Sequence, residues 1–239
     1  MSSLRTQSKT ILGAFAAMLL FTAISAAQIA GLCNTGQTAA TSAGCTGALV
    51  PPNPTGGGPN RDGNWGLTYR PLSVRRKPCL LQGYVNAWVD TPYFTWLPNS
   101  VSTASEWITT YDGEASKAAG WYAYRVAFPV PFVLPGGTVP TGVTINGQLT
   151  SDNSTFAIFL ESPANSGNCS IVSGQKFPVN PYGGDTFQQW WPFSFTNASQ
   201  ITPGADAYLY FVVQNMACND GCFNPTGFRA EFFSTSAFN

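Results

Sequence analysis

Four aromatic residues are the first candidates for contact with a ligand. Trp190 and Trp191 are adjacent in a predicted strand, and successive strand residues point to opposite faces, so one of the two is expected to leave the core. Tyr93 and Trp96 lie in a proline-rich, loop-like stretch. Aromatic faces stack on ring-shaped ligands, so these residues are predicted to bind a polysaccharide. The alternative is that the rings cap the ends of the domain.

Four polar residues form the second group of predicted ligand contacts. Asp152 and Asn153 make a predicted turn before a strand, where their side chains either reach a ligand or close an Asx turn with their own backbone. Asn215 ends another predicted strand. Arg229 alternates with apolar neighbours and therefore points away from them. We expect Arg229 to bind a ligand, to be solvated or to pair with a carboxylate.

Three acidic residues are candidates for a structural calcium site. Asp112 and Glu114 form an acidic turn, and together with Asp90 they could supply the several oxygen ligands that a calcium ion takes. Their spacing matches no EF-hand loop, and a plain polar turn is the alternative. No other cofactor is expected.

Catalysis is not expected from this sequence. The chain has no histidine, which excludes Ser-His-Asp and Cys-His arrangements, and no glycine-rich phosphate loop follows a predicted strand. A pair of carboxylates, as in glycoside hydrolases, remains open as an alternative. The acids available for it are Glu106, Asp112, Glu114 and Glu161.

Composition also bears on the partners of the protein. Charged residues make up 9% of the 239 residues, and eleven basic residues balance eleven acidic ones. Soluble domains usually carry about 25% charged residues. Without a basic field the chain is not expected to bind nucleic acid. Low charge with 44% hydrophobic residues is typical of an extracellular all-β protein.

Residues 1–27 are predicted to be an export signal. Arg5 and Lys9 precede an apolar run from Ile11 to Ala27, and small residues before Gln28 favour cleavage there. An uncleaved membrane anchor is the alternative. No later segment is long and apolar enough to span a membrane, so the mature chain is expected to be secreted or at the cell surface.

Six cysteines follow this signal, and an even number in an exported chain indicates disulfides. Connectivity cannot be deduced from spacing alone. The pairing we favour has a small loop, a long-range bridge and a tight turn: Cys33–Cys45, Cys79–Cys169 and Cys218–Cys222.

The elements that would position these residues are short strands. Residues 28–62 are rich in Gly, Pro, Thr and Ala and are predicted to be a flexible linker or arm. Residues 63–239 show alternating apolar positions separated by turn residues, which favours an all-β, antiparallel two-sheet β-sandwich of the jelly-roll type. Residues 105–117 are predicted to hold one helical turn at most. The predicted strands cover 81–89, 121–130, 143–149, 156–161, 170–177, 188–196, 207–214 and 227–233.

Part of the chain resembles a known group of proteins. Three ordered stretches resemble a pattern in secreted bacterial β-sandwich proteins, many with a PEP-CTERM sorting tail, that are similar to galactose-binding-like jelly rolls. The stretches are 120–128, then 145–147 with 152–160, then 193–195 with Gly204, 209–215 and 224–229. The match covers roughly residues 100–235.

The chain departs from that pattern at three points. Residues 161–163 and an insertion carrying Cys169 replace the usual Asn-Gly hairpin, the Asn expected after Gly204 is shifted, and no sorting tail follows Phe238-Asn239. The resemblance implies a jelly-roll fold, a cell-surface or extracellular-matrix location and, at the level of the superfamily, carbohydrate binding.

Three functions are therefore predicted. The first is a secreted, non-catalytic binding or surface module that recognises a polysaccharide. The second is a structural subunit that self-associates by strand-edge pairing or exchange of the 28–62 arm. The third is a glycoside hydrolase.

Overall fold

The computed structural model of the chain describes residues 29–39, 45, 47–52, 60–68, 77–110, 117–172, 187–197, 201–217 and 224–239. The predicted signal peptide and the predicted bridge Cys218–Cys222 lie outside these residues. Within them the chain is all-β, with two short 3-10 helices at Pro78–Leu80 and Asn99–Val101. The strands are β1 (Arg61–Thr68), β2 (Tyr84–Asp90), β3 (Trp107–Thr109), β4 (Gly120–Pro129), β5 (Val143–Asp152), β6 (Ser154–Glu161), β7 (Cys169–Ile171), β8 (Trp191–Asn197), β9 (Asp206–Asn215), β10 (Gly227–Phe232) and β11 (Ala237–Phe238).

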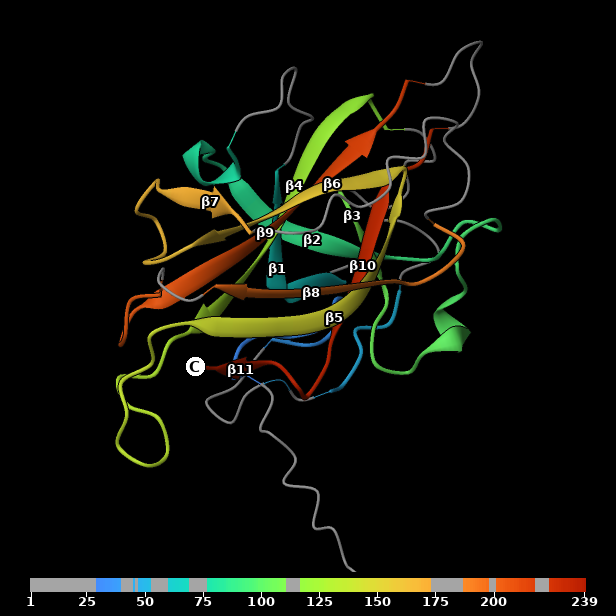
Figure 1. Cartoon of the computed structure of the whole chain (residues 1–239). Coiled ribbons are helices and arrows are strands. Elements are labelled where there is room, and N and C mark those ends of the chain that lie inside the picture. Colours follow the sequence, from blue (N-terminus) through green and yellow to red (C-terminus); the bar gives the residue numbers. More distant parts are fainter. Residues whose placement is uncertain are drawn as a thin grey trace, which may run out of the picture.

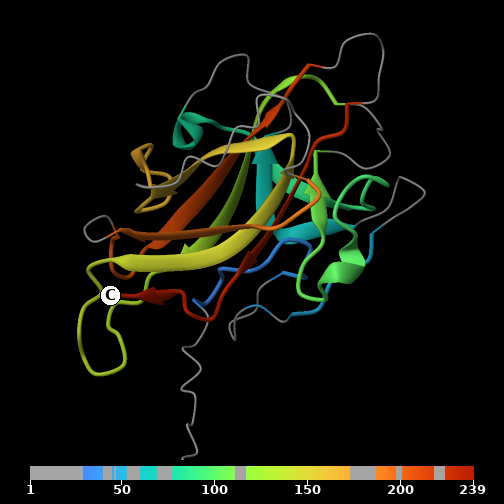
Figure 2. The same ribbon diagram turned by 45° about the vertical axis from the view of Figure 1, so that its right-hand side comes forward.

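All described strands belong to one continuous antiparallel sheet. Its order is β11-β5-β10-β3-β2-β1-β4-β9-β6-β7, and β8 pairs with β5. The longest pairing, β4 with β9, runs from Gly120 opposite Asn215 to Pro129 opposite Asp206. Figure 1 and Figure 2 both show β5 and β8 running across β4 and β9. The sheet therefore folds over itself around the core.

This architecture refines the expectation from the sequence. Seven strands lie where the alternating pattern predicts them, because alternation reports a half-buried strand directly. For the eighth, predicted at 170–177, the structure describes β7 (Cys169–Ile171), and residues 173–177 lie outside the described residues. Strand pairing is continuous through β3 and β10 instead of dividing into two sheets. Within the stretch 105–117, for which one helical turn at most is predicted, Trp107–Thr109 pairs with β2 and forms β3, and residues 111–116 lie outside the described residues.

The core lies between the two layers and is built around aromatic rings. The Trp65 ring is fully buried, with its centroid 5.5 Å from that of Phe228 and 5.7 Å from that of Phe211. Phe193 of β8 also meets Phe211, at 5.7 Å, from the opposite layer. Each buried aromatic side chain of this kind contributes roughly 1.5–3 kcal/mol to folding. These ring contacts thus fix how the two layers pack against each other.

A second, smaller cluster covers the outward face of β4, β6 and β9. It contains Ala123, Phe159 and Tyr210, among others, and the disulfide Cys79–Cys169 lies against it. This bridge joins positions 90 residues apart. The predicted pairings Cys33–Cys45 and Cys79–Cys169 are both confirmed.

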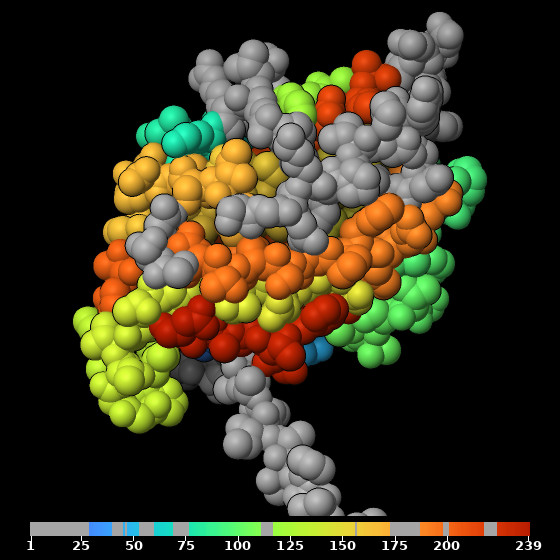
Figure 3. Space-filling model, viewed as in Figure 1, coloured from blue at the N-terminus to red at the C-terminus, as the bar shows by residue number. Residues whose placement is uncertain are grey.

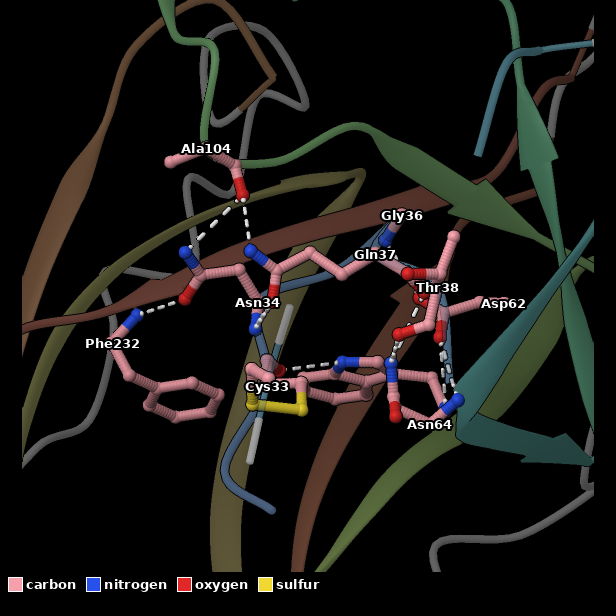
Figure 4. The surroundings of a disulfide bond; sticks show 11 residues. Cys33, Asn34, Gly36, Gln37, Thr38, Asp62, Asn64, Ala104 and Phe232 are labelled. Atoms are coloured by element: carbon pink, nitrogen blue, oxygen red, sulfur yellow. Dashed lines mark hydrogen bonds between the residues drawn. A yellow bond between two sulfur atoms is a disulfide. The ribbon is translucent and has the colours of Figure 1, made fainter. Parts of the chain in front are cut away.

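Residues 29–39 pack into the sheet (Figure 4). Leu32 and Cys33 are fully buried. The backbone N–H of Thr35 donates to the carbonyl oxygen of Ala230 at 3.1 Å, and the N–H of Glu106 donates to the carbonyl oxygen of Thr35 at 2.9 Å. The segment thus bridges β10 and the residue that precedes β3.

Side chains of residues 29–39 also form hydrogen bonds that hold the segment against its neighbours. The amide oxygen of Asn34 accepts a hydrogen bond from the N–H of Phe232 at 2.7 Å, and the amide groups of Asn34 and Gln37 both donate to the carbonyl oxygen of Ala104. Asp62 accepts the N–H of Gly36 at 2.6 Å. The expectation of an unpacked linker over 28–62 differs from the structure at residues 29–39, because buried apolar side chains, the Cys33–Cys45 disulfide and hydrogen bonds of polar side chains order this part of the segment.

Candidate functional site

A pocket opens at one end of the sheet, where several strands end or begin. Loops after β2, β5 and β9 meet the segments that precede β8 and β10. Its cavity volume is about 400 Å³, within the range of roughly 300–1,000 Å³ common for small-molecule sites. The pocket is lined by Tyr93, Phe94, Thr95, Asp152, Asn153, Phe187, Met216, Ala217, Asn224 and Pro225.

Asp152, the last residue of β5, contributes a nearly buried carboxylate to this pocket. Its side chain is 4% exposed, and Oδ2 accepts a hydrogen bond from Nε1 of Trp96 at 2.8 Å. Burial raises the pKa of Asp152 to about 7, and the bond from Trp96 opposes that rise. Asp152 therefore changes charge near neutral pH while it lines a ligand-sized cavity.

Trp96 supports the carboxylate from beneath. Its ring is 3% exposed and packs against that of Trp107, with ring centroids 4.3 Å apart and the planes tilted by 33°. Gly227 makes room for it, because a Cβ at that position would lie 2.5 Å from Cη2 of Trp96. Trp96 is thus a positioning residue of the pocket and not a surface for stacking.

Asn153 and the backbone of Asp152 anchor the loops around the carboxylate. The side-chain oxygen of Asn153 accepts the N–H of Met216 at 2.7 Å. The Thr226 hydroxyl donates to the carbonyl oxygen of Asp152 at 2.7 Å, and the Thr109 hydroxyl donates to the carbonyl oxygen of Thr226 at 2.6 Å. These bonds tie β3, β5, β9 and β10 together at the pocket.

The rim of the pocket is aromatic and apolar. Phe94 is 92% exposed, and its ring centroid lies 6.2 Å from that of Tyr93. The carbonyl oxygen of Phe187 accepts the N–H of Leu97 at 2.7 Å, which links the two loops that bear these rings. The arrangement offers ring faces beside a carboxylate, which suits a ligand with both apolar faces and hydroxyl groups.

Tyr93, Asp152 and Asn153 are thus the predicted residues that line the pocket, and Trp96 lies directly behind it. The other four predicted residues lie elsewhere.

Arg229 is fully buried, and its bonds are to its own chain. Nε donates to Oγ of Ser105 at 2.8 Å, Nη2 donates to the carbonyl oxygen of Ser105 at 2.8 Å, and Nη1 donates to that of Pro98 at 3.0 Å. Burial lowers the pKa of Arg229 to about 10 against the opposing effect of nearby Glu231, so it stays cationic at neutral pH. It fixes the loop that follows the pocket aromatics.

The two adjacent tryptophans both contact buried residues of this chain. The Arg229 guanidinium lies 4.9 Å from the centroid of the Trp190 ring, so this ring covers a structural cation. Trp191 is partly buried and packs against the core. Asn215 is 1% exposed, and its amide donates to the carbonyl oxygen of Ala118 at 3.1 Å. All three support loops or core in this structure.

Of the three residues predicted to bind calcium, one lies among the described residues. Asp90 ends β2, opposite Trp107 of β3, whereas Asp112 and Glu114 lie outside the described residues. Among the residues that the structure describes, no group of three or more His, Cys, Asp or Glu side chains could hold a metal ion.

Phe94, Phe187 and Met216 are pocket residues that the sequence analysis did not identify. Phe94 had a signal, since it lies between Tyr93 and Trp96 in a short loop that is dense in aromatic residues. Phe187 and Met216 reach the pocket through the folding of the sheet, which brings the start of β8 beside the end of β9.

Comparisons with known proteins add no assignment. No model of a protein family matches this chain, and the search of curated proteins found no match. No described helix is long and apolar enough to cross a membrane.

Proposed function

We propose that this chain is an exported, non-catalytic module that binds a polysaccharide in the pocket of Tyr93 and Asp152. The observation that carries the proposal is the pairing of an exposed aromatic rim with a nearly buried carboxylate in one cavity. A sugar ring offers an apolar face that packs on aromatic side chains and hydroxyl groups that donate to a carboxylate.

The contacts of Asp152 support this assignment. Its hydrogen bond to Trp96 uses Oδ2, and within the described chain no bond engages Oδ1. A ligand hydroxyl that donates to Oδ1 would replace water at a site of low dielectric, where the bond is stronger. Phe94 stands at the rim, 92% exposed, and would gain the most burial from a bound ring.

The absence of catalysis is supported by the separation of the carboxylates. Asp152 is the carboxylate among the described lining residues, whereas glycoside hydrolases of the common type use two that flank the bond. Glu161 is fully buried, and its oxygens accept hydrogen bonds from Tyr210 and from the N–H of Gly167. It has a structural role on a different face.

Export is supported by the two disulfides, which persist in oxidising compartments. The continuous folded sheet is compatible with a distant relation to galactose-binding-like jelly rolls, which is the source of the carbohydrate proposal at the level of the superfamily.

Affinity electrophoresis on a panel of soluble polysaccharides tests the proposal. At least one polymer should retard the wild-type chain, and Phe94→Ala should weaken that retardation, equivalent to about 1–3 kcal/mol of binding free energy. Phe132→Ala is a matched control, because Phe132 is 73% exposed and lies in the loop between β4 and β5, which is yellow-green at the lower left of Figure 3. This loop precedes the first residue of β5, whereas the pocket contains its last residue, Asp152.

Two results would count against the proposal. No retardation on any polymer removes the polysaccharide, and equal weakening by Phe94→Ala and Phe132→Ala removes the pocket. Release of reducing sugar ends during incubation would contradict the non-catalytic part.

A further inference from the structure

The outward face of β1, β2, β4 and β9 carries a second hollow, of about 170 Å³. Its floor is Gly66, where the strand has no side chain. A Cβ there would lie 3.1 Å from Nε of Arg125 and 3.5 Å from Cβ of Tyr84. The walls include Asn86 and Tyr208. The glycine leaves the room in which the Arg125 side chain lies across the strand.

Arg125 is the cation of this hollow, and aromatic rings hold it. Its guanidinium carbon lies 4.0 Å from the centroid of the Tyr84 ring and 4.6 Å from that of Tyr208. The Tyr84 hydroxyl donates to the carbonyl oxygen of Pro78 at 3.1 Å, which fixes that ring. A guanidinium that stacks through its faces keeps its N–H donors in the plane between the rings.

These donors have no protein acceptor within the described chain. The contacts of the Arg125 head group are the two rings, and no described carboxylate lies within ion-pair distance. Glu161, which acts electrostatically on Tyr84 and Tyr210, accepts hydrogen bonds from Tyr210 and from the N–H of Gly167. Arg229 differs from Arg125 in this respect, because all of its side-chain nitrogens donate to oxygens of its own chain.

We propose that this hollow binds the carboxylate of an acidic sugar unit. A guanidinium donates two parallel hydrogen bonds to a planar carboxylate, and such charge-assisted pairs are stronger than neutral ones. Asn86 at the wall and the Tyr208 ring supply amide and aromatic contacts for the rest of the sugar. The carboxylate follows from Arg125 itself, whereas the choice of a sugar as its carrier rests on the proposed function.

A second cation on the same face extends the site into a strip. The guanidinium carbon of Arg61 lies 4.4 Å from the centroid of the Trp88 ring. Tyr84 and Trp88 point to the same face of β2, about 13 Å apart along the strand at roughly 3.3 Å per residue. The two arginine–aromatic pairs are thus spaced for separate acidic units of one polymer.

Binding of oligogalacturonate, compared with its methyl ester, tests the inference. Esterification removes the negative charge and keeps the sugar chain. By titration calorimetry at low salt, the wild-type protein should bind the acid about tenfold or more tightly than the ester. Arg125→Gln should remove most of that preference and leave the part that Arg61 supplies. Arg125→Lys, which keeps the charge and loses the planar fork, should retain more of the preference.

Equal binding of acid and ester by the wild type, or an unchanged preference in Arg125→Gln, would overturn the inference. Phe94→Ala separates this site from the pocket of Tyr93, since it should leave the acid preference intact. Circular dichroism of Arg125→Gln confirms that the variant is folded. Loss of binding to neutral polysaccharides in Phe94→Ala alone would concern the proposed function and not this hollow.

Discussion

The indole Nε1 of Trp96 donates a 2.8 Å hydrogen bond to Oδ2 of Asp152, and both side chains are nearly buried. The bond joins the loop after β2 to the end of β5, 56 residues away. It connects the aromatic rim of the pocket to its carboxylate, so a change in either residue should affect both the stability of the loop and the charge of the pocket.

Trp96→Phe tests this connection. Phenylalanine keeps a ring against Trp107 and removes the donor, so the variant should lose about 1–3 kcal/mol of unfolding free energy in urea titrations. The pKa of Asp152 should rise further, since the bond from Trp96 lowers it. NMR titration of the Asp152 carboxyl carbon would measure this shift, and an unchanged pKa would contradict the role of the indole.

The same carboxylate should make the proposed ligand binding depend on pH. Burial raises the pKa of Asp152 to about 7, so the stronger acceptor, the ionised form, is present above that pH. Polysaccharide affinity should therefore increase as pH rises through about 7, by up to tenfold per unit below it. Asp152→Asn should bind with little dependence on pH, and a wild-type affinity that falls over this range would contradict the assignment.

The strands were predictable because alternating apolar residues report a half-buried strand without reference to the rest of the fold. Positions 121–130, for example, give the same alternation in the sequence as the buried face of β4. The burial of Arg229, which is a long-range consequence of folding, was not predictable. Arg229 has the sequence context of an exposed strand residue, and its burial depends on a loop of distant residues.

The pocket was predictable only in part, because some of its residues have local signals in the sequence and others are brought together by the fold. Asp152 and Tyr93 carry local signals, a turn and an aromatic loop, whereas their convergence depends on the curl of the sheet. Residues 29–39 illustrate the limit of composition, because Asn34, Thr35 and Gln37 order that segment by hydrogen bonds to named backbone groups.

Arg229 and Arg125 provide a matched pair of arginine substitutions. Arg229→Lys leaves buried carbonyl oxygens without donors, so it should cost about 3 kcal/mol or more of unfolding free energy. Arg125→Lys loses ring contacts alone and should cost about 1 kcal/mol or less. Chemical denaturation of both variants measures the difference. A similar cost for the two would contradict the contrast between a structural and a ligand-binding arginine.

Glu106 predicts a dependence of stability on pH. Burial raises the pKa of Glu106 from 4.5 to about 7, and its buried Oε2 atom has no hydrogen-bond partner among the described residues. Because the pKa in the folded state is the higher one, this contribution to stability is full below about 4.5 and is lost as pH rises through about 7. Glu106→Gln should raise the melting temperature at about pH 8 and leave it nearly unchanged at about pH 4. A gain of equal size at both pH values would contradict this explanation.

The two disulfides should differ in their contribution to stability. Chain-entropy reasoning gives about 3 kcal/mol for the 12-residue separation of Cys33–Cys45 and about 4.5 kcal/mol for the 90-residue separation of Cys79–Cys169. Double Cys→Ala variants, compared by urea denaturation, should show the larger loss for Cys79 and Cys169. The reverse order would indicate that the packing of residues 29–39 depends on its bridge more than loop length implies.

Titration calorimetry with an oligosaccharide from the best-binding neutral polysaccharide tests the central proposal most directly. Wild type and Phe132→Ala should bind with the same affinity, and Phe94→Ala and Asp152→Asn should each bind at least about tenfold more weakly. Equal affinity in all four proteins would contradict the assignment of the pocket between Tyr93 and Asp152 as the polysaccharide site.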